Sequence, residues 1–112
     1  MTEKKLLTAA AFGILMSLGG KIRLDYNIVR HGYGIAQNVY EDSGGRLKLG
    51  AGTLYGTLRK LQENGLIEEV PYLEDGTRRV SYRLTKNGWD RLTEELGYYE
   101  KITRLARERG LI

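Results

Sequence analysis

Hydrogen-bond donors and glycines recur at helical spacing in the middle of the chain, between Gly50 and Gly65. Leu54, Leu58 and Leu61 follow one another at intervals of four and three residues, so a helix over this segment buries one leucine face. The residues expected on the opposite face are Gly52, Gly56, Arg59 and Glu63, flanked by Thr53, Tyr55 and Lys60. Glycines leave the helix backbone uncovered, and hydroxyl, guanidinium and ammonium groups donate hydrogen bonds to phosphates and base edges. The pattern predicts a helix that enters the major groove of a nucleic acid duplex.

Length, charge and cysteine content bound this hypothesis. A chain of 112 residues has the size of one domain and can remove roughly two-thirds of its unfolded surface from water. Lys and Arg number 18 against 14 Asp and Glu, and the net charge of +4 favours a polyanionic partner. The absence of cysteine excludes disulfides, thiolate zinc sites and cysteine nucleophiles. The longest apolar segment, 6–18, is shorter than the roughly 20 residues that span a bilayer. We expect a cytoplasmic protein with no membrane contact.

The rest of the chain predicts helices and a hairpin in a definite order. Glycine-rich clusters end the helices, and alternating apolar residues indicate strands. Expected helices cover Glu3–Leu18, Gly32–Glu41, Ala51–Asn64 and Thr85–Arg109, and expected strands cover Lys21–Arg30, Leu66–Tyr72 and Arg78–Leu84. This order describes a winged helix-turn-helix, a mainly α fold with a small β-hairpin and a long C-terminal dimerisation helix. We expect a single winged-helix domain over residues 1–112, with the dimerisation helix in residues 85–112.

The predicted hairpin, called the wing below, combines a packed face with a cationic one. Pro71 cannot donate to a sheet ladder and so predicts an edge strand, and Asp75-Gly76 is typical of a tight turn. In the return strand the residues expected to pack are Val80, Tyr82 and Leu84, and those expected to face solvent are Arg79, Ser81 and Arg83. Arg78 and Arg79, close to the turn, suit a minor groove or its phosphates. An ordinary solvated face is the alternative.

Apolar residues of the first and last helices exceed what one core of this size can cover. In the last helix they recur at spacings of three and four residues, as in a helix seam. The residues expected at a dimer interface, or around a ligand bound there, are Leu6, Ile14, Leu18, Trp89, Leu92, Leu96, Tyr98, Tyr99, Ile102 and Leu105. The aromatic members are expected mainly as anchors of the seam. The excess predicts a homodimer.

Four motifs occur in order within residues 14–96: His31-Gly-Tyr-Gly-Ile-Ala, Gly52-Thr-Leu-Tyr-Gly-Thr-Leu, Leu61-Gln-Glu-Asn-Gly-Leu-Ile and Arg79-Val-Ser-Tyr-Arg-Leu-Thr-Lys-Asn-Gly. Together they resemble the PadR family of bacterial transcriptional regulators. The resemblance to the short members of that family implies a homodimeric DNA-binding repressor that dimerises through its first and last helices. The chain departs from the family pattern at Gly56, where a proline is usual, and at Gly50-Ala51, where Ser-Pro is usual. The link Lys21–Arg30 is longer than usual by several residues, and its role is not assigned.

Contacts with double-stranded DNA are therefore expected from the third helix, the link before it and the wing: Lys48, Thr53, Tyr55, Arg59, Lys60, Arg78 and Arg79. Tyr55 has a simpler alternative role, packing at the edge of the core; the resemblance favours a phosphate contact. The glycines Gly50, Gly52 and Gly56 lack the spacing of a dinucleotide loop. His31 has no cysteine or clustered carboxylate with which to form a metal site or a catalytic triad. No nucleophile with an adjacent base is present, so we expect no enzyme, no metal and no cofactor.

Two other functions stay open beside DNA-binding repression. A small aromatic or hydrophobic effector in a pocket at the dimer interface is compatible with repression, and the aromatic residues of the last helix favour it. A winged-helix module that binds a protein instead of DNA is disfavoured by Arg59, Lys60 and the wing arginines. These patterns do not specify the operator, the regulated genes or the choice between repression and activation.

Overall fold

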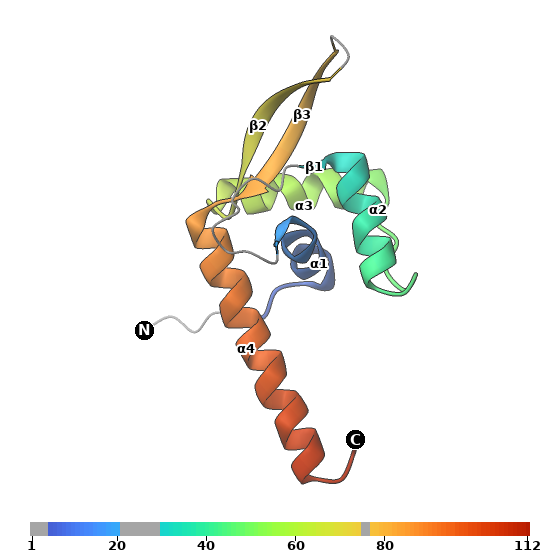
Figure 1. Ribbon diagram of the computed structural model, residues 1–112, viewed down its shortest axis with the longest axis vertical. Coiled ribbons are helices and arrows are strands. Elements are labelled where there is room, and N and C mark those ends of the chain that lie inside the picture. Colours follow the sequence, from blue (N-terminus) through green and yellow to red (C-terminus); the bar gives the residue numbers. More distant parts are fainter. Residues whose placement is uncertain (1–4, 21–29, 75–76) are drawn as a thin grey trace.

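The computed structural model describes residues 5–20, 30–74 and 77–112 and arranges them as a winged helix-turn-helix (Figure 1). Its helices are α1 (Ala9–Leu18), α2 (Gly32–Asp42), α3 (Ala51–Glu63) and α4 (Lys86–Glu108), and its strands are β1 (Arg30–His31), β2 (Ile67–Glu74) and β3 (Thr77–Leu84). The predicted fold class is confirmed, including the long last helix. In these three described ranges no helix has the length and apolar character needed to cross a bilayer.

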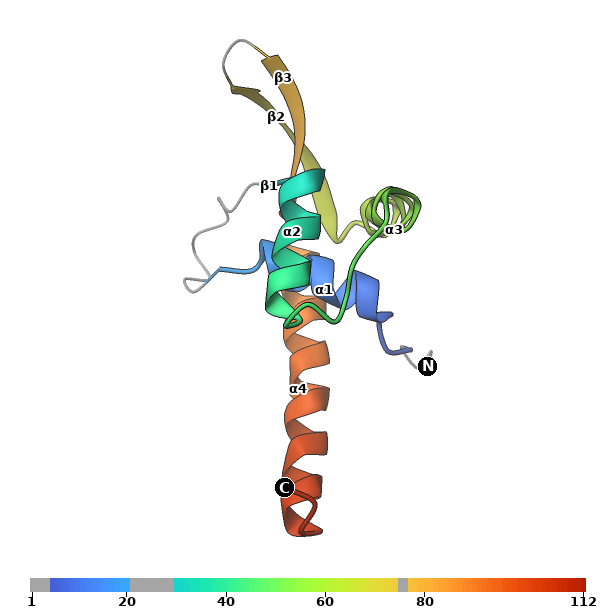
Figure 2. The ribbon, with the colours of Figure 1, turned by 90° about the vertical axis from the view of Figure 1, so that its right-hand side faces the viewer.

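A hydrophobic core joins the helices to the base of the sheet. α1 lies at its centre and contacts α2, α3 and α4 (Figures 1 and 2). Ile14, Leu15 and Leu18 of α1 are fully buried there, together with three leucines of α3. Because each such side chain stabilises the fold by about 1.5–3 kcal/mol when buried, α1 holds α3 firmly against the rest of the domain.

The first helix begins at Ala9, and the prediction of a start at Glu3 was wrong. Thr8 is the N-cap, and its Oγ1 accepts a hydrogen bond from the Ala11 N–H at 3.1 Å. A threonine in this position satisfies one of the donors that a helix start leaves unpaired. The cap therefore fixes the start of the helix later than the apolar periodicity indicated.

The segment before the cap lies along α4 because a buried ion pair binds its backbone. Glu95 is buried, and its Oε2 accepts a hydrogen bond from the Leu7 N–H at 2.6 Å. Arg91 donates to the other oxygen of Glu95 at 2.7 Å and to the Lys5 carbonyl at 2.7 Å. These backbone groups would otherwise take part in a first helical turn, so the ion pair explains why residues 5–8 are not helical.

Strand β3 lies between two edge strands in the antiparallel order β1-β3-β2. Pro71 lies in β2, so the prediction of an edge strand there is confirmed. β1 was not predicted as a partner of the wing. Its Arg30 and His31 pair with Tyr82 and Ser81 of β3, respectively. The chain therefore reaches α2 directly from the sheet.

The predicted alternation in β3 fails at its centre. Val80 is 51% exposed although it was expected to pack, and Ser81 is 2% exposed although it was expected to face solvent. Ser81 lies where β1 and α2 contact β3, whereas Val80 lies beyond the pairing with β1, towards the free end of the wing. Residues 21–29 of the predicted strand Lys21–Arg30 lie outside the described residues, as do the turn residues 75–76.

The wing and the second half of α4 project from opposite ends of the domain (Figures 1 and 2). The longest dimension is 56 Å and the radius of gyration is 15.3 Å. A compact domain of this length has a radius of gyration of roughly 13 Å. The difference reflects two extensions that the protomer's own core does not cover.

Candidate nucleic-acid interface

α3 turns its leucines inward and its glycines outward. Leu54, Leu58 and Leu61 are buried in the core. A Cβ added at Gly52 or Gly56 would meet no heavy atom outside the helix within 4 Å. The bare face expected from the sequence is therefore present, and a partner can approach the backbone of α3 more closely than it could approach a helix covered by side chains.

The donors predicted on and before α3 are accessible. Lys48 in the preceding link is exposed, as are Thr53, Arg59 and Lys60 on the helix itself. Tyr55 is 50% exposed. Figure 2 shows α3 end-on, standing out at the side of the domain. The surface of α3 thus combines cations and hydroxyl groups with an uncovered backbone, which suits phosphate and base contacts.

The wing places two predicted arginines near its free end. Arg79 pairs with Tyr72 across the hairpin, and Arg78 lies one residue nearer the turn. Their side chains lie outside what the structure describes, so their contact with DNA stays a prediction.

A third arginine of the wing, Arg83, forms an ion pair with Glu68. Arg83 Nε donates to Glu68 Oε1 at 2.7 Å, and both side chains are partly exposed. The neighbouring carboxylate offsets the positive charge of the guanidinium. Arg83 is therefore less suited to bind phosphate than a cation without a carboxylate beside it.

Gly32, the first residue of α2, is a part of this site that the sequence analysis missed. A Cβ added there would lie 2.9 Å from Oη, 3.0 Å from Cε1 and 3.1 Å from Cζ of Tyr55. The Tyr55 ring thus lies directly against the start of α2, and half of the side chain still faces solvent. The motif that begins at His31 contains this glycine, but nothing in the sequence indicates which residue of α3 it meets.

Tyr82 of β3 lies near the same contact. It is buried and pairs with Glu69 across the hairpin. Burial raises the pKa of Tyr82 above its ordinary value, and Glu69 and Tyr55 raise it further by charge repulsion. The Tyr82 phenol is consequently harder to ionise than an ordinary tyrosine.

The predicted dimer residues divide into two groups. Ile14, Leu18, Trp89 and Leu92 are buried in the protomer's own core, so the expectation that they form part of a surplus surface is corrected. Their partners are the other core residues, because α1 and the first half of α4 pack together. The group that stays accessible consists of Leu6, Leu96, Tyr98, Tyr99, Ile102 and Leu105, with Leu105 partly covered.

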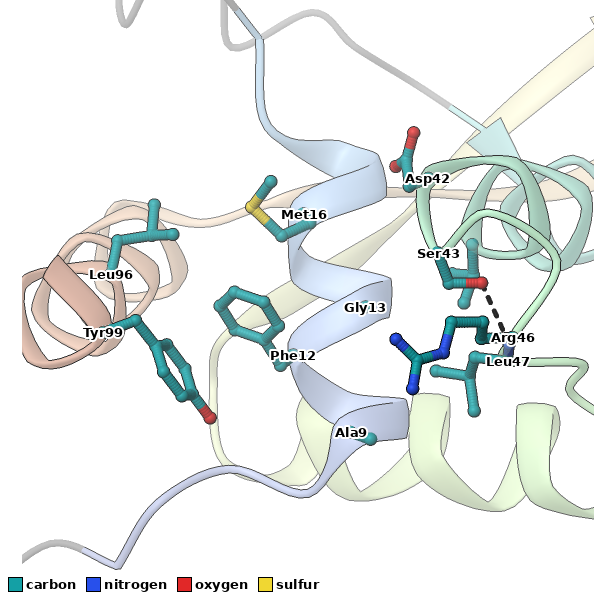
Figure 3. A pocket seen from close by; sticks show the side chains of 11 residues that line it. Ala9, Phe12, Gly13, Met16, Asp42, Ser43, Arg46, Leu47, Leu96 and Tyr99 are labelled. Carbon is teal, nitrogen blue, oxygen red and sulfur yellow. Dashed lines mark hydrogen bonds between the residues drawn. The ribbon is translucent and has the colours of Figure 1, made fainter. Parts of the chain in front are cut away.

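A groove of about 690 Å³ runs between α1, α4 and the end of α2 with the link that follows it (Figure 3). The Phe12 and Tyr99 rings meet edge to face on its α4 side, with centroids 5.3 Å apart. Asp42, Ser43 and Arg46 line the opposite side, where the Ser43 Oγ accepts the Leu47 N–H at 2.9 Å. The groove draws on three separate segments, which explains why sequence periodicity did not reveal it.

Leu96 and Tyr99 are the two residues from the predicted dimer and ligand set that line this groove, which is otherwise formed by other side chains. Tyr98 is not among the lining residues; its ring stacks edge to face on Tyr99 at 5.3 Å. Within the described part of the chain, no group of three or more His, Cys, Asp or Glu residues is placed to hold a metal ion.

A winged helix with a bare cationic helix surface defines a class of nucleic-acid-binding domains, and comparisons with known proteins agree. The chain matches the model of the transcriptional regulator PadR-like family over residues 27–94. No curated protein gives a significant match. Because the family model covers more than half of the chain, this protein belongs to the PadR-like family of transcriptional regulators.

Solved structures show the same fold. The chain is 25% identical to a PadR family transcription regulator from Clostridium difficile R20291, with a TM-score of 0.74 over 90% of this chain and 97% of that one. A Streptococcus transcriptional regulator is 24% identical, with a TM-score of 0.71 over 96% and 99% of the two chains. Bacillus subtilis PadR in complex with operator DNA is 24% identical, with a TM-score of 0.61 over 77% of this chain and 45% of that one.

Proposed function

We propose that this protein is a homodimeric, sequence-specific DNA-binding repressor that recognises an inverted-repeat operator and acts in the cytoplasm without enzymatic activity. The observation that carries the proposal is the outward face of α3, where Gly52 and Gly56 leave the backbone open between exposed donors. A helix in the major groove needs such donors at its surface, and open glycines allow close approach to the duplex. The Bacillus subtilis neighbour is in complex with operator DNA, which supports DNA binding as the function of this fold.

In the proposed complex α3 enters the major groove, and Thr53, Tyr55, Arg59 and Lys60 make most of its contacts. Lys48 binds the phosphate backbone beside the helix. Arg78 and Arg79 reach the adjacent minor groove or its phosphates from the wing. The residues on and before α3 are assigned by their exposure, and the two arginines by their position in β3.

The second copy in the proposed dimer covers the second half of α4 and the groove beside it. Leu96, Tyr99 and Ile102 are each about 40% exposed in the protomer, on a helix that extends beyond the core (Figure 1). Soluble monomers rarely leave a contiguous apolar surface of this kind uncovered. A two-fold dimer presents two copies of α3, so the operator is expected to be an inverted repeat with half-sites about 34–36 Å, or twice that distance, apart.

A small aromatic effector is the second candidate for the groove. The edge-to-face pair of Phe12 and Tyr99 and the guanidinium of Arg46 line it and favour a flat ligand. Such a ligand releases DNA only if it binds the DNA-incompetent dimer more tightly, and tenfold release needs about 1.4 kcal/mol of difference. Titration of the purified protein with phenolic acids and flat dyes, followed by Trp89 fluorescence and sedimentation, separates the two occupants.

The decisive experiment for the repressor is a gel shift with the promoter of the protein's own transcription unit, followed by footprinting. We expect a protected inverted repeat and binding that weakens steeply as salt rises, because phosphate contacts release counterions. Equal affinity for unrelated duplexes, or no retardation at low salt, would contradict sequence-specific repression.

A further inference from the structure

The contact between Tyr55 and Gly32 joins the exposed surface of α3 to the start of α2. Tyr55 is the one tyrosine of α3, and its side chain is half exposed. The three ring atoms nearest to Gly32 lie 2.9, 3.0 and 3.1 Å from the position that a Cβ would occupy there. Carbon atoms in contact are normally about 3.5–4.0 Å apart. The ring therefore occupies space that only a glycine at position 32 leaves free.

Gly32 is buried, and its backbone does not require a glycine for conformational reasons. It is the first residue of an α-helix, and its φ is not in the left-handed region, in contrast to Gly44, Gly45 and Gly65. Alanine is a better helix former than glycine. The helix alone would thus favour alanine at this position, and the space taken by Tyr55 is the feature that opposes it.

We propose that Gly32 is a positioning residue for DNA binding. The Tyr55 ring packs against the α-carbon of Gly32, which carries no side chain, and this contact holds the Tyr55 hydroxyl on the DNA-facing flank of α3. This inference rests on the proposed function, since it assigns a contact with DNA to Tyr55. Because Oη, at the far end of the side chain, is the atom nearest to the missing Cβ, a larger residue at position 32 turns the hydroxyl away without disturbing the core. Through this contact between Gly32 and Tyr55, α2 affects DNA affinity although α2 does not itself enter the major groove.

The contact with Gly32 favours one position of the Tyr55 ring. The start of α2 borders one side of the ring, and half of the side chain is exposed to solvent. A side chain bordered in this way has few rotamers available, so less conformational entropy is lost when its hydroxyl binds a phosphate.

A double-mutant cycle on DNA affinity tests the inference. The four proteins are the wild type, Gly32→Ala, Tyr55→Ala and the double variant, each titrated against the operator duplex that the wild type protects. We expect Gly32→Ala to weaken binding roughly tenfold, the scale of one hydrogen bond to a charged phosphate. In the Tyr55→Ala background the same substitution should change affinity by less than about twofold, because no ring remains to be displaced.

Tyr40→Phe is the matched control for loss of a hydroxyl. Tyr40 also lies against a glycine, with its Oη 3.3 Å from the Cβ position of Gly45, but it is near the end of α2 that is farther from Gly32. The Tyr40→Phe substitution should leave DNA affinity unchanged. Tyr55→Phe should weaken DNA binding and also remove most of the effect of Gly32→Ala.

Each outcome decides the proposal. If the losses caused by Gly32→Ala and Tyr55→Ala multiply in the double variant, or if Gly32→Ala binds like the wild type, Gly32 does not position Tyr55. If Gly32→Ala fails to fold, recovery of folding in the double variant assigns the strain to Tyr55, and persistent unfolding overturns the inference. A wild type that binds no duplex overturns the proposed function itself, and this inference with it.

Discussion

The outward faces of α3 and of the second half of α4 have opposite chemistry although both helices are amphipathic. α3 buries three leucines and exposes glycine, arginine and lysine. α4 buries Trp89, Leu92 and Glu95 in its first half, and its second half, which has no buried residue, exposes leucine, tyrosine and isoleucine. An uncovered polar face suits a hydrated polyanion, whereas an uncovered apolar face is stabilised by removal from water.

The difference leads us to expect different partners for the two helices. On α3 the apolar leucines are satisfied within the protomer, so the residues left outside are available for a charged ligand. On α4 the core ends near Glu95, and the apolar pattern continues for roughly three further turns, in which Tyr99 meets Phe12 but no residue is buried. One surface is therefore expected to bind DNA and the other a second copy of the chain.

The largest effect is expected from a charge placed on the α4 surface. Ile102 is 43% exposed in the protomer, so Ile102→Asp should not unfold an isolated chain. In a dimer the new carboxylate would be buried without a partner, and we expect the dissociation constant of the dimer to rise at least about 100-fold. Sedimentation equilibrium and circular dichroism measure assembly and folding separately.

Lys101→Gln is the control for this substitution, because it makes the same change of net charge at the adjacent exposed position. It should leave the dimer intact. An Ile102→Asp protein that stays dimeric at nanomolar concentration would remove α4 from the interface and with it the proposed contrast between the two helices.

The second effect concerns the bare face of α3. A Cβ at position 56 would have no other heavy atom within 4 Å, so Gly56→Glu should not lower stability, and replacing a helical glycine gains up to about 1 kcal/mol. We expect roughly 30-fold weaker DNA binding, because a carboxylate would lie where phosphates or base acceptors approach. Fluorescence anisotropy with the operator duplex measures the change, and thermal unfolding checks the fold.

Two further substitutions at this position separate charge from volume. Gly56→Ala adds one methyl group, and Gly56→Lys has a length similar to that of Glu with the opposite charge. If close approach of the backbone matters, both should weaken binding, although less than Gly56→Glu. If Gly56→Lys binds more tightly than the wild type, electrostatics alone accounts for the α3 surface.

Most of the fold could be predicted because its signals in the sequence are local. The leucines of α3, Pro71 in β2 and the motif glycines each constrain the backbone within a few residues, and the observed elements follow them. The start of α1 was misplaced because a side chain 88 positions away binds the backbone at Leu7. The burial of Ile14 and Trp89 was also missed, since periodicity identifies an apolar face but not whether that face meets its own core or a second copy.

In the candidate site, the exposure of side chains on one helix could be predicted, but contacts between helices could not. Exposed donors on α3 follow from the helical period, so Thr53, Arg59 and Lys60 were placed correctly on its surface. The contact between the Tyr55 ring and Gly32 joins α3 to α2. The two residues are far apart in the sequence, and no spacing rule connects them. Contacts between elements depend on packing, which a single sequence does not specify.

The smallest effect is expected from the wing, where we propose that Arg78 and Arg79 add a second cationic surface to that of α3. Replacing Arg78 and Arg79 by alanine should weaken binding to all duplexes by less than about tenfold and reduce the salt slope by about 0.9 for each phosphate that is no longer neutralised. The relevant measurement is the logarithm of the binding constant against the logarithm of salt concentration, for operator and unrelated duplexes in parallel.

Arg83→Ala is the matched control on the same strand, because Arg83 is already paired with Glu68 at 2.7 Å. Its removal costs a surface ion pair worth at most about 1 kcal/mol and should leave the salt slope nearly unchanged. If Arg83→Ala lowers the slope as much as the removal of Arg78 and Arg79 does, the base of the wing binds DNA. If none of these substitutions changes the slope, the wing arginines are an ordinary solvated face, and the DNA interface is confined to α3 and the link before it.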